Sequence, residues 1–244
     1  MSTYCISDIH GNMKLWHQMK STIKMEDKLI CLGDCADRGE DGWEIIKDML
    51  RGVNDNWITY VRGNHEQMLI DALDDYINYD GMCDYAFMLL CQNGGYKTFT
   101  AATNDNYIKE WFALLKKTIP FYIYKNTEGK KIFLSHAGCS WNTIRHFENN
   151  QYDKEPKEMK DYLRKELTWN RKHNVAYKPC EFDYQVFGHT PIPYIISEEE
   201  FMKDPGVHYF DNGHKINIDC GTYATNIGIL FDLDTFDEHI FQIK

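Results

Sequence analysis

The chain has 244 residues, and its 43% hydrophobic and 14% aromatic content excludes a disordered protein. Its 37 acidic residues outnumber 27 Lys and Arg, giving a formal net charge of −10, which argues against broad nucleic-acid binding because that needs a basic face. No apolar run approaches the ~20 residues of a membrane span and no secretory signal is visible, so we expect a cytoplasmic protein with reduced cysteines.

The first third of the chain alternates strand and helix signals. Short apolar runs at 4–7, 29–32 and 57–61 are typical of buried strands, and apolar residues recur at helical spacing over 43–50 and 68–76. Strands and helices that alternate at these lengths predict parallel strands joined by crossover helices.

The remainder begins with a helical pattern and returns to strands. The pattern over 81–117 predicts helices, 142–157 is polar and loop-like, and a helix is expected to follow as far as 167. The predicted β elements are a hairpin of 121–124 and 131–135, a strand at 184–187, a hairpin turn at 211–213, and strands at 227–233 and 239–243. No linker or repeat interrupts the chain, so we expect a single α/β domain over residues 1–244 with the helical middle as an insertion.

Polar and titratable side chains follow five of the predicted strands. The carboxyl ends of parallel strands are where ligands bind in α/β sheets, so these side chains are expected to meet at one edge. They are Asp8 and His10 after the first strand, Asp34, Asp37 and Arg38 after the second, Arg62, Asn64, His65 and Glu66 after the third, and His136 and His189 after 131–135 and 184–187.

Carboxylate, imidazole and amide groups in one place indicate a site for a borderline divalent metal such as Mn, Fe, Zn or Ni rather than Ca or Mg. These ligands outnumber the needs of one ion. The two predicted sets, which share Asp34, are Asp8, His10 and Asp34, and Asp34, Asn64, His136 and His189. Two ions roughly 3.5–4 Å apart can hold a hydroxide and stabilise the oxygens of an in-line displacement, so the arrangement predicts phosphoester hydrolysis.

Each of these residues also has a purely structural interpretation. Asp8, Asp34 and Asn64 could cap the helices that follow them, and His136 and His189 could be interior histidines with satisfied hydrogen bonds. Capping requires no histidine at a strand end, however, and gives no reason for the neighbouring arginines. The structural interpretation therefore fails for the set as a whole.

Several longer motifs surround these residues. They are Gly33-Asp-Cys-Ala-Asp-Arg-Gly39, Arg62-Gly-Asn-His-Glu-Gln-Met-Leu-Ile-Asp71, Asn93-Gly-Gly95, Ser135-His-Ala137, Trp169-Asn-Arg171, Phe187-Gly-His-Thr-Pro191 and Ile218-Asp-Cys-Gly221. Through them the chain resembles the metal-dependent serine/threonine protein phosphatases of the PPP family, most closely the compact bacteriophage and bacterial branch. Ser7 stands where the family usually has Gly. The resemblance covers most of the chain and implies a calcineurin-like metallophosphoesterase fold, with a central β-sandwich flanked by helices and a helical insertion.

The resemblance also implies roles for individual residues. It assigns the two ligand sets above to two divalent ions, with Mn²⁺ as the expected metal. Arg38, Arg62 and Arg171 would hold the phosphate, since a planar guanidinium binds two of its oxygens at once. His65 would protonate the leaving alkoxide as a general acid, and Asp37 would accept a hydrogen bond from the other ring nitrogen. Glu66 is expected to support the site or to begin the following helix.

The implied activity is hydrolysis of phosphoserine and phosphothreonine in phosphoproteins or phosphopeptides, by direct attack of a hydroxide held between the two ions. The alternative on the same scaffold is a diadenosine tetraphosphate hydrolase, or a broad phosphoesterase that also accepts small phosphate esters. A non-catalytic binding module is a third class, although every expected ligand is present. We expect no stable nucleic-acid binding and no membrane association. An acidic surface around a cationic pocket should admit a phosphate dianion while disfavouring extended polyanions.

Overall fold

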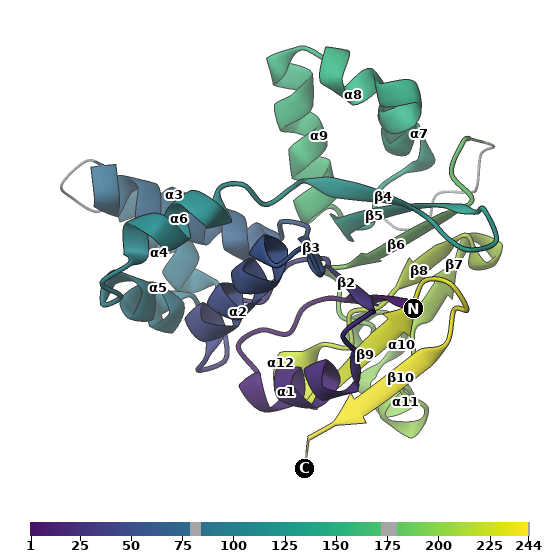
Figure 1. The fold of residues 1–244 in the computed structure, drawn as a ribbon, viewed down its shortest axis with the longest axis horizontal. Helices are drawn as coiled ribbons and strands as arrows, with labels where there is room; N and C mark the ends of the chain where they lie inside the picture. Colours follow the sequence, from purple (N-terminus) through teal and green to yellow (C-terminus); the bar gives the residue numbers. More distant parts are fainter. Residues whose placement is uncertain (79–83, 172–179, 244) are drawn as a thin grey trace.

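A computed structural model describes residues 1–78, 84–171 and 180–243, and its strands form two five-stranded sheets (Figure 1). The strands are β1 (Thr3–Ile6), β2 (Lys28–Cys31), β3 (Ile58–Tyr60), β4 (Phe121–Lys125), β5 (Lys131–Ala137), β6 (Tyr184–Gly188), β7 (His208–Phe210), β8 (Lys215–Asn217), β9 (Ile227–Asp232) and β10 (Glu238–Gln242). The helices are α1 (Met13–Thr22), α2 (Gly42–Asn54), α3 (Asn64–Asn78), α4 (Asp84–Gln92), α5 (Tyr96–Thr103), α6 (Ile108–Leu115), α7 (Trp141–Ile144), α8 (Gln151–Lys154), α9 (Lys157–Trp169), α10 (Pro193–Ile196), α11 (Glu198–Lys203) and α12 (Thr222–Thr225). Two 3-10 turns are η1 (Arg145–Asn150) and η2 (Asp211–Gly213).

Each sheet has a parallel centre. The first has the order β10-β9-β1-β2-β3, with β1, β2 and β3 parallel as the alternation of elements predicts. The second has the order β4-β5-β6-β8-β7, with β5, β6 and β8 parallel and antiparallel strands at both edges. The predicted hairpins are confirmed as the β4–β5 and β7–β8 pairs.

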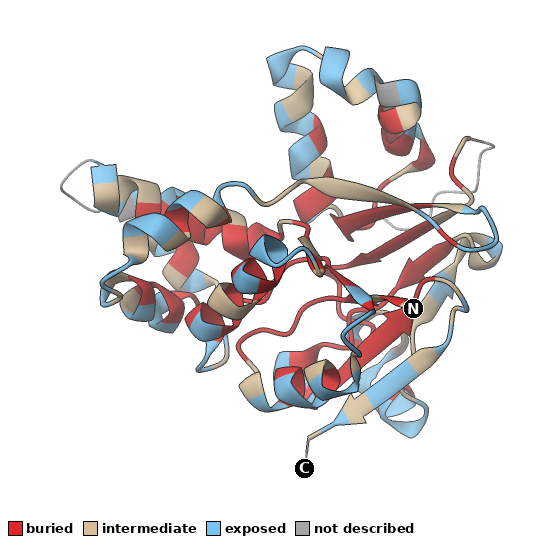
Figure 2. Ribbon diagram, viewed as in Figure 1, coloured by how far each residue is buried: buried red, intermediate tan, exposed pale blue. Residues whose placement is uncertain are grey.

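The two sheets pack face to face. Successive residues of a strand point to opposite faces, so Cys5 and Ile30 of the first sheet meet Ile132 and Leu134 of the second in one buried cluster. Figure 2 shows this buried interior between the sheets. The predicted central β-sandwich is therefore confirmed.

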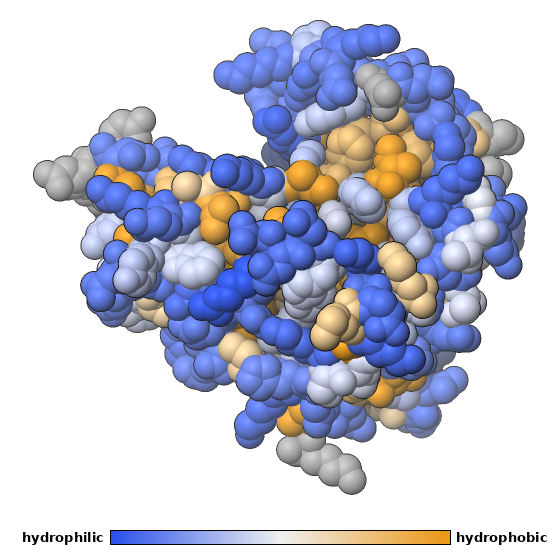
Figure 3. All heavy atoms as spheres, viewed as in Figure 1, coloured by the Kyte–Doolittle hydropathy of each residue, from blue (hydrophilic) through white to orange (hydrophobic). Residues whose placement is uncertain are grey.

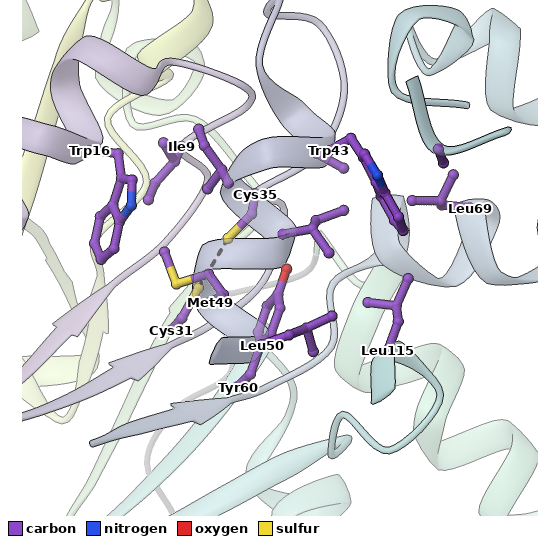
Figure 4. Close-up of a cluster of buried hydrophobic side chains, with 14 of the residues drawn as sticks. Ile9, Trp16, Cys31, Cys35, Trp43, Met49, Leu50, Tyr60, Leu69 and Leu115 are labelled. Carbon is purple, nitrogen blue, oxygen red and sulfur yellow. Dashed lines mark hydrogen bonds between the residues drawn. The ribbon is translucent and has the colours of Figure 1, made fainter. Parts of the chain in front are cut away.

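Helices cover the outer face of the first sheet. Trp16 of α1, Trp43 and Met49 of α2 and Leu69 of α3 are buried in a cluster with Cys31, whose side chain points away from the second sheet (Figure 4). Cys35 is buried in the same cluster, and its Sγ is 3.3 Å from Sγ of Cys31. The strand-to-helix loop after β2 is thus anchored in the core directly beside Asp34.

The helical insertion also supports that loop. Helices α4, α5 and α6 confirm the predicted helical middle, of which residues 81–83 lie outside the described residues. The hydroxyl of Thr98 on α5 accepts a hydrogen bond from the backbone N–H of Asp37, and the Gly94 carbonyl accepts one from Arg38 N–H. The insertion therefore fixes the backbone that carries two predicted site residues.

The segment 142–157 differs from the expected loop. It forms α7, η1 and α8, and α9 follows immediately. Trp141, Ile144 and Phe147 are spaced three residues apart and pack with Phe133 of β5 against α9. These buried apolar side chains stabilise the short helices. The sequence pattern does not predict them, because polar residues outnumber the apolar ones in this segment. In the described part of the chain, none of the helices is both long and apolar enough to cross a membrane.

Candidate dimetal active site

The predicted site residues come from both sheets. Asp8 and His10 follow β1, Asp34 follows β2, and Asn64 and His65 begin α3 after β3. The second sheet supplies the other two histidines: His136 lies inside β5 rather than after it, and His189 follows β6. The expectation of a single sheet edge is corrected to the convergence of two sheets, because the sandwich brings the ends of β5 and β6 against those of β1 and β2.

The backbone of the site is unusual. Six of the predicted residues have positive φ angles of 47–69°: Asp8, His10, Asp34, Asp37, Arg38 and His189. Such conformations cost free energy in residues other than glycine and persist where surrounding contacts enforce them. Close packing enforces them here, since a Cβ at Gly63 would overlap Oδ1 of Asp34 and a Cβ at Gly188 would overlap Oδ2 of Asp8.

Asp34 lies at the centre of the arrangement. Its Oδ2 is 3.3 Å from Nε2 of His136, 3.8 Å from that of His65 and 3.9 Å from that of His10. Among the described residues, two groups of three have ligand atoms within 4.8 Å of one another, and both contain Asp34: His10, Asp34 and His65, and Asp34, His136 and His189. One carboxylate shared between two clusters is the arrangement expected of a bridging ligand.

In the first predicted ligand set the ring of His10 is fixed by the backbone. Its Nδ1 donates to the Ala36 carbonyl at 2.9 Å, so Nε2 faces the carboxylates, 3.8 Å from Oδ1 of Asp8. Oδ2 of Asp8 accepts hydrogen bonds from the Ser7 hydroxyl and from the His189 N–H at 3.0 Å. The Ser7 hydroxyl therefore holds the carboxylate in place.

The second predicted set is also oriented from outside. Nδ1 of His136 donates to the Leu32 carbonyl at 2.8 Å, and Nε2 faces Oδ1 of Asn64 at 2.9 Å. Within the described residues, Nε2 of His189 is buried and has no hydrogen-bond partner. A buried imidazole nitrogen left unpaired costs free energy unless a ligand satisfies it. The residues of this set therefore fit a divalent metal ion.

The protonation states of the predicted ligands are set by burial and by their charged neighbours. Burial alone would raise the pKa of Asp34, but the neighbouring His136 and His65 hold it well below its usual range. Burial would lower the pKa of His136, but Asp34 raises it to about 10. Burial, together with His136 and Arg171, lowers the pKa of His189 to about 2. In the protein without metal, His136 thus carries the proton that compensates Asp34, and His189 is neutral and ready to bind a cation.

His65 and Asp37 form the predicted pair. Nδ1 of His65 donates to Oδ2 of Asp37 at 2.7 Å, and both side chains are buried. Burial would lower the pKa of His65, but Asp34 and the hydrogen bond to Asp37 raise it above its ordinary value. This places a proton-holding imidazole with a fixed tautomer beside the metal ligands.

The three predicted phosphate-binding arginines are placed differently. Arg38 donates to Nε2 of His10 at 3.0 Å and to Nε2 of His65 at 3.2 Å, so it lies between the two imidazoles. Arg171 donates to the His189 carbonyl at 3.2 Å. Arg62 instead donates to Gln67, Thr118 and the Lys116 carbonyl, away from the histidines. Its role in phosphate binding stays a prediction.

Tyr223 is a further residue at the site, and the sequence gives no signal for it. The guanidinium carbon of Arg38 lies 4.5 Å from the centre of the Tyr223 ring, which supports the planar cation from one face. The Tyr223 hydroxyl is hydrogen-bonded to that of Tyr194. Both tyrosines come from segments distant in sequence from Arg38, so their approach depends on the tertiary fold.

Glu66 supports the site through the backbone. Its carboxylate is buried and accepts hydrogen bonds from the N–H groups of Asp34 at 2.7 Å, Cys35 at 2.9 Å and Gly63 at 2.9 Å, and from the Tyr60 hydroxyl at 3.0 Å. One side chain thus joins the loop after β2 to the loop after β3. Both loops carry predicted metal ligands, so Glu66 fixes the separation of the ligands.

We expect Glu66→Ala to destabilise the fold strongly. The substitution removes the carboxylate that accepts from five buried donors, the four above and the more distant Ala36 N–H at 3.4 Å, and such losses cost about 3–5 kcal/mol in the free energy of unfolding. Urea unfolding followed by circular dichroism measures the change. Glu26→Ala, at an exposed position, is the control and should change the free energy by less than about 0.5 kcal/mol. A loss below about 1 kcal/mol for Glu66→Ala would contradict the assigned role.

Comparison with known proteins assigns the chain to a family. The family model of the calcineurin-like phosphoesterases matches residues 1–215, and the chain belongs to that family. The predicted fold and the prediction of a hydrolase are therefore confirmed.

Individual relatives are similar over most of their length. Serine/threonine-protein phosphatase 1 of Salmonella typhimurium is 26% identical over 214 residues, which are 86% of this chain and 85% of that protein. A cold-active protein-tyrosine phosphatase of a psychrophilic Shewanella aligns with a TM-score of 0.59 at 18% identity, covering 98% of this chain and 77% of the other. A putative diadenosine tetraphosphatase aligns with a TM-score of 0.55 at 14% identity, covering 98% and 92%. At these identities the two solved structures show the fold alone.

Proposed function

We propose that the protein is a metal-dependent protein phosphatase that hydrolyses phosphoserine and phosphothreonine esters, with Mn²⁺ as its working metal. The observation that carries the proposal is the position of Asp34, shared between two histidine clusters, beside the His65–Asp37 pair. The first arrangement suits two divalent ions, and the second suits protonation of a poor leaving group. The similarity to a bacterial serine/threonine-protein phosphatase over 86% of the chain supports the same substrate class.

The proposed roles of the protein's own residues follow from their contacts. Bound by the two ligand sets, divalent ions would neutralise phosphate charge and supply an activated water. Arg38 contacts His10 of the first ligand set, Arg171 contacts His189 of the second, and both bind the phosphate oxygens. When Arg38 turns to the phosphate, it releases Nε2 of His65. His65 then holds a proton on Nε2, stabilised by Asp37, and donates it to the oxygen of the departing serine or threonine.

Phosphopeptide hydrolysis with controlled metal content tests the proposal. With Mn²⁺, we expect turnover of phosphoserine and phosphothreonine peptides, a fall of at least about a hundredfold after chelation, and recovery when Mn²⁺ is restored. Parallel assays use a phosphotyrosine peptide and diadenosine tetraphosphate. Turnover that survives complete chelation would refute the metal dependence. A higher kcat/KM for the dinucleotide than for any phosphopeptide would favour the alternative function.

A further inference from the structure

A groove of about 540 Å³ lies beside the second ligand set, between α9 and the ends of α3 and α6. Arg62 and Lys116 line one wall, and Asp161, Arg164 and Lys165 of α9 line the other. Figure 3 shows a notch with largely hydrophilic walls where the helices around α9 stand apart from the helical insertion. We call this feature the basic groove.

The charge of the basic groove is opposite to that of the whole protein. Four cationic side chains and one carboxylate line it, on a chain with a net charge of −10. Lys116 lies 3.7 Å from Asp74 and Arg164 lies 3.3 Å from Asp161, but these half-exposed pairs contribute little and can be exchanged for other anions. Lys165 is exposed and has no ion-pair partner among the residues that the structure describes.

The basic groove is continuous with the candidate active site. Trp169 lines the groove, and its ring centre is 6.0 Å from that of His189. On the opposite wall, Arg62 precedes Asn64 by two residues. The groove face of α9 runs from Asp161 to Trp169, about 12 Å at 1.5 Å per residue. An extended peptide covers that distance with about four residues.

We propose that the basic groove binds acidic side chains within about four residues of the phosphorylated residue, and so selects acidic phosphopeptides; this inference rests on the proposed function. Consider a peptide whose phosphate lies in the proposed metal site around Asp34 and whose chain passes Trp169. Its next side chains lie between Lys116 and Lys165. Carboxylates there meet cations on both walls. A nucleic acid fits poorly, since the acidic remainder of the surface repels an extended polyanion.

The test compares two phosphothreonine peptides that differ only in flanking residues, four Glu against four Gln, placed on either side of the phosphothreonine in turn. For one of the two placements, the wild-type protein should prefer the Glu peptide by about tenfold in kcat/KM, as expected for two or three exposed charge contacts. Lys116→Glu with Lys165→Glu should reduce the preference to less than about twofold, and Lys165→Glu alone to about threefold. The wild-type preference should shrink as ionic strength increases.

Matched control substitutions lie on α9 and on α6, the helix that Lys116 directly follows. Lys109→Glu with Lys157→Glu changes the net charge equally at exposed positions of α6 and α9 outside the groove, and should leave the preference intact. If the Gln peptides are hydrolysed but the wild-type protein has no preference, the groove inference alone is wrong. The inference is also wrong if the two control substitutions together remove the preference for Glu as strongly as Lys116→Glu with Lys165→Glu. A third outcome that contradicts it is that Lys116→Glu with Lys165→Glu weakens only the hydrolysis of diadenosine tetraphosphate.

A binding measurement separates this inference from the proposed function. If no phosphopeptide is hydrolysed, the proposed function fails, and fluorescence anisotropy of a labelled Glu peptide then examines the groove on its own. Weaker binding to the Lys116→Glu, Lys165→Glu protein than to the control pair supports an anion-binding groove. Equal binding to both proteins refutes it.

Discussion

Asp34→Asn is expected to abolish tight Mn²⁺ binding and, with it, phosphoester hydrolysis. Oδ2 of Asp34 faces Nε2 of His136, His65 and His10 at 3.3–3.9 Å, so both predicted metal sites lose the same negative charge. Loss of a group that merely orients a ligand already weakens metal binding by about 10–100-fold. For the shared ligand itself we expect at least about a hundredfold weaker binding at both sites.

Isothermal titration with Mn²⁺ and elemental analysis of the loaded protein measure the effect. Asp232→Asn is the matched control, because Asp232 is also buried and its Oδ1 accepts backbone hydrogen bonds from Asp234 and Thr235 in a turn remote from the histidines. The control should bind two ions, as we expect of the wild-type protein. An Asp34→Asn protein that retains two ions with unchanged affinity would rule out the shared-ligand role.

The same titration reports the proton carried by His136. Because the pKa of His136 is about 10, the metal-free protein is protonated there at pH 8 and must release that proton when the metal binds. The release should decline as the pH rises through 10, since the free protein has then already lost the proton. His189 contributes none, because its pKa is about 2. Titration in two buffers that differ in ionisation enthalpy measures the proton count.

The convergence of the predicted metal ligands could be anticipated because their signal is local in sequence. Each follows or ends a short apolar strand, and the carboxyl ends of parallel strands converge whatever the rest of the fold. What the local pattern could not supply is the distribution over two sheets. The strand that contains His136 pairs with the strand before His189, but only the buried contacts between the sheets bring both imidazoles to Asp34.

The contacts that fix the site were harder to predict because they join distant segments. From the sequence, Glu66 is expected to support the site or to begin a helix, and it does both. What the sequence does not give is its partners, the backbone N–H groups of the loop 34–35, which lie about thirty residues earlier. Tyr223 reaches Arg38 across 185 residues. Arg62 follows its strand as expected, but a long side chain can turn either way, and here it turns to Thr118. Sequence spacing constrains backbone position more closely than side-chain direction.

His65→Asn is expected to slow hydrolysis of phosphoserine and phosphothreonine peptides by about 10²–10⁴-fold while leaving the metals bound. The backbone N–H of His65 donates to Oδ1 of Asp34 at 3.0 Å, and Asn keeps that bond. What is lost is the imidazole that Asp37 orients at 2.7 Å. A serine or threonine alkoxide needs protonation as it leaves, whereas an aryl phenolate needs little. The loss on p-nitrophenyl phosphate should therefore be much smaller than on the peptides.

The substitution Asp37→Asn, alone and combined with His65→Asn, tests whether Asp37 acts through His65. If Asp37 acts only through His65, the double variant should be no slower than His65→Asn alone, because groups that act as one unit are not additive. His17→Asn, at an exposed position of α1, is the control and should keep wild-type rates on both substrates. Equal losses on peptide and aryl phosphate, or fully additive losses in the double variant, would show that His65 does not deliver the proton. Elemental analysis of each variant distinguishes such a result from loss of metal.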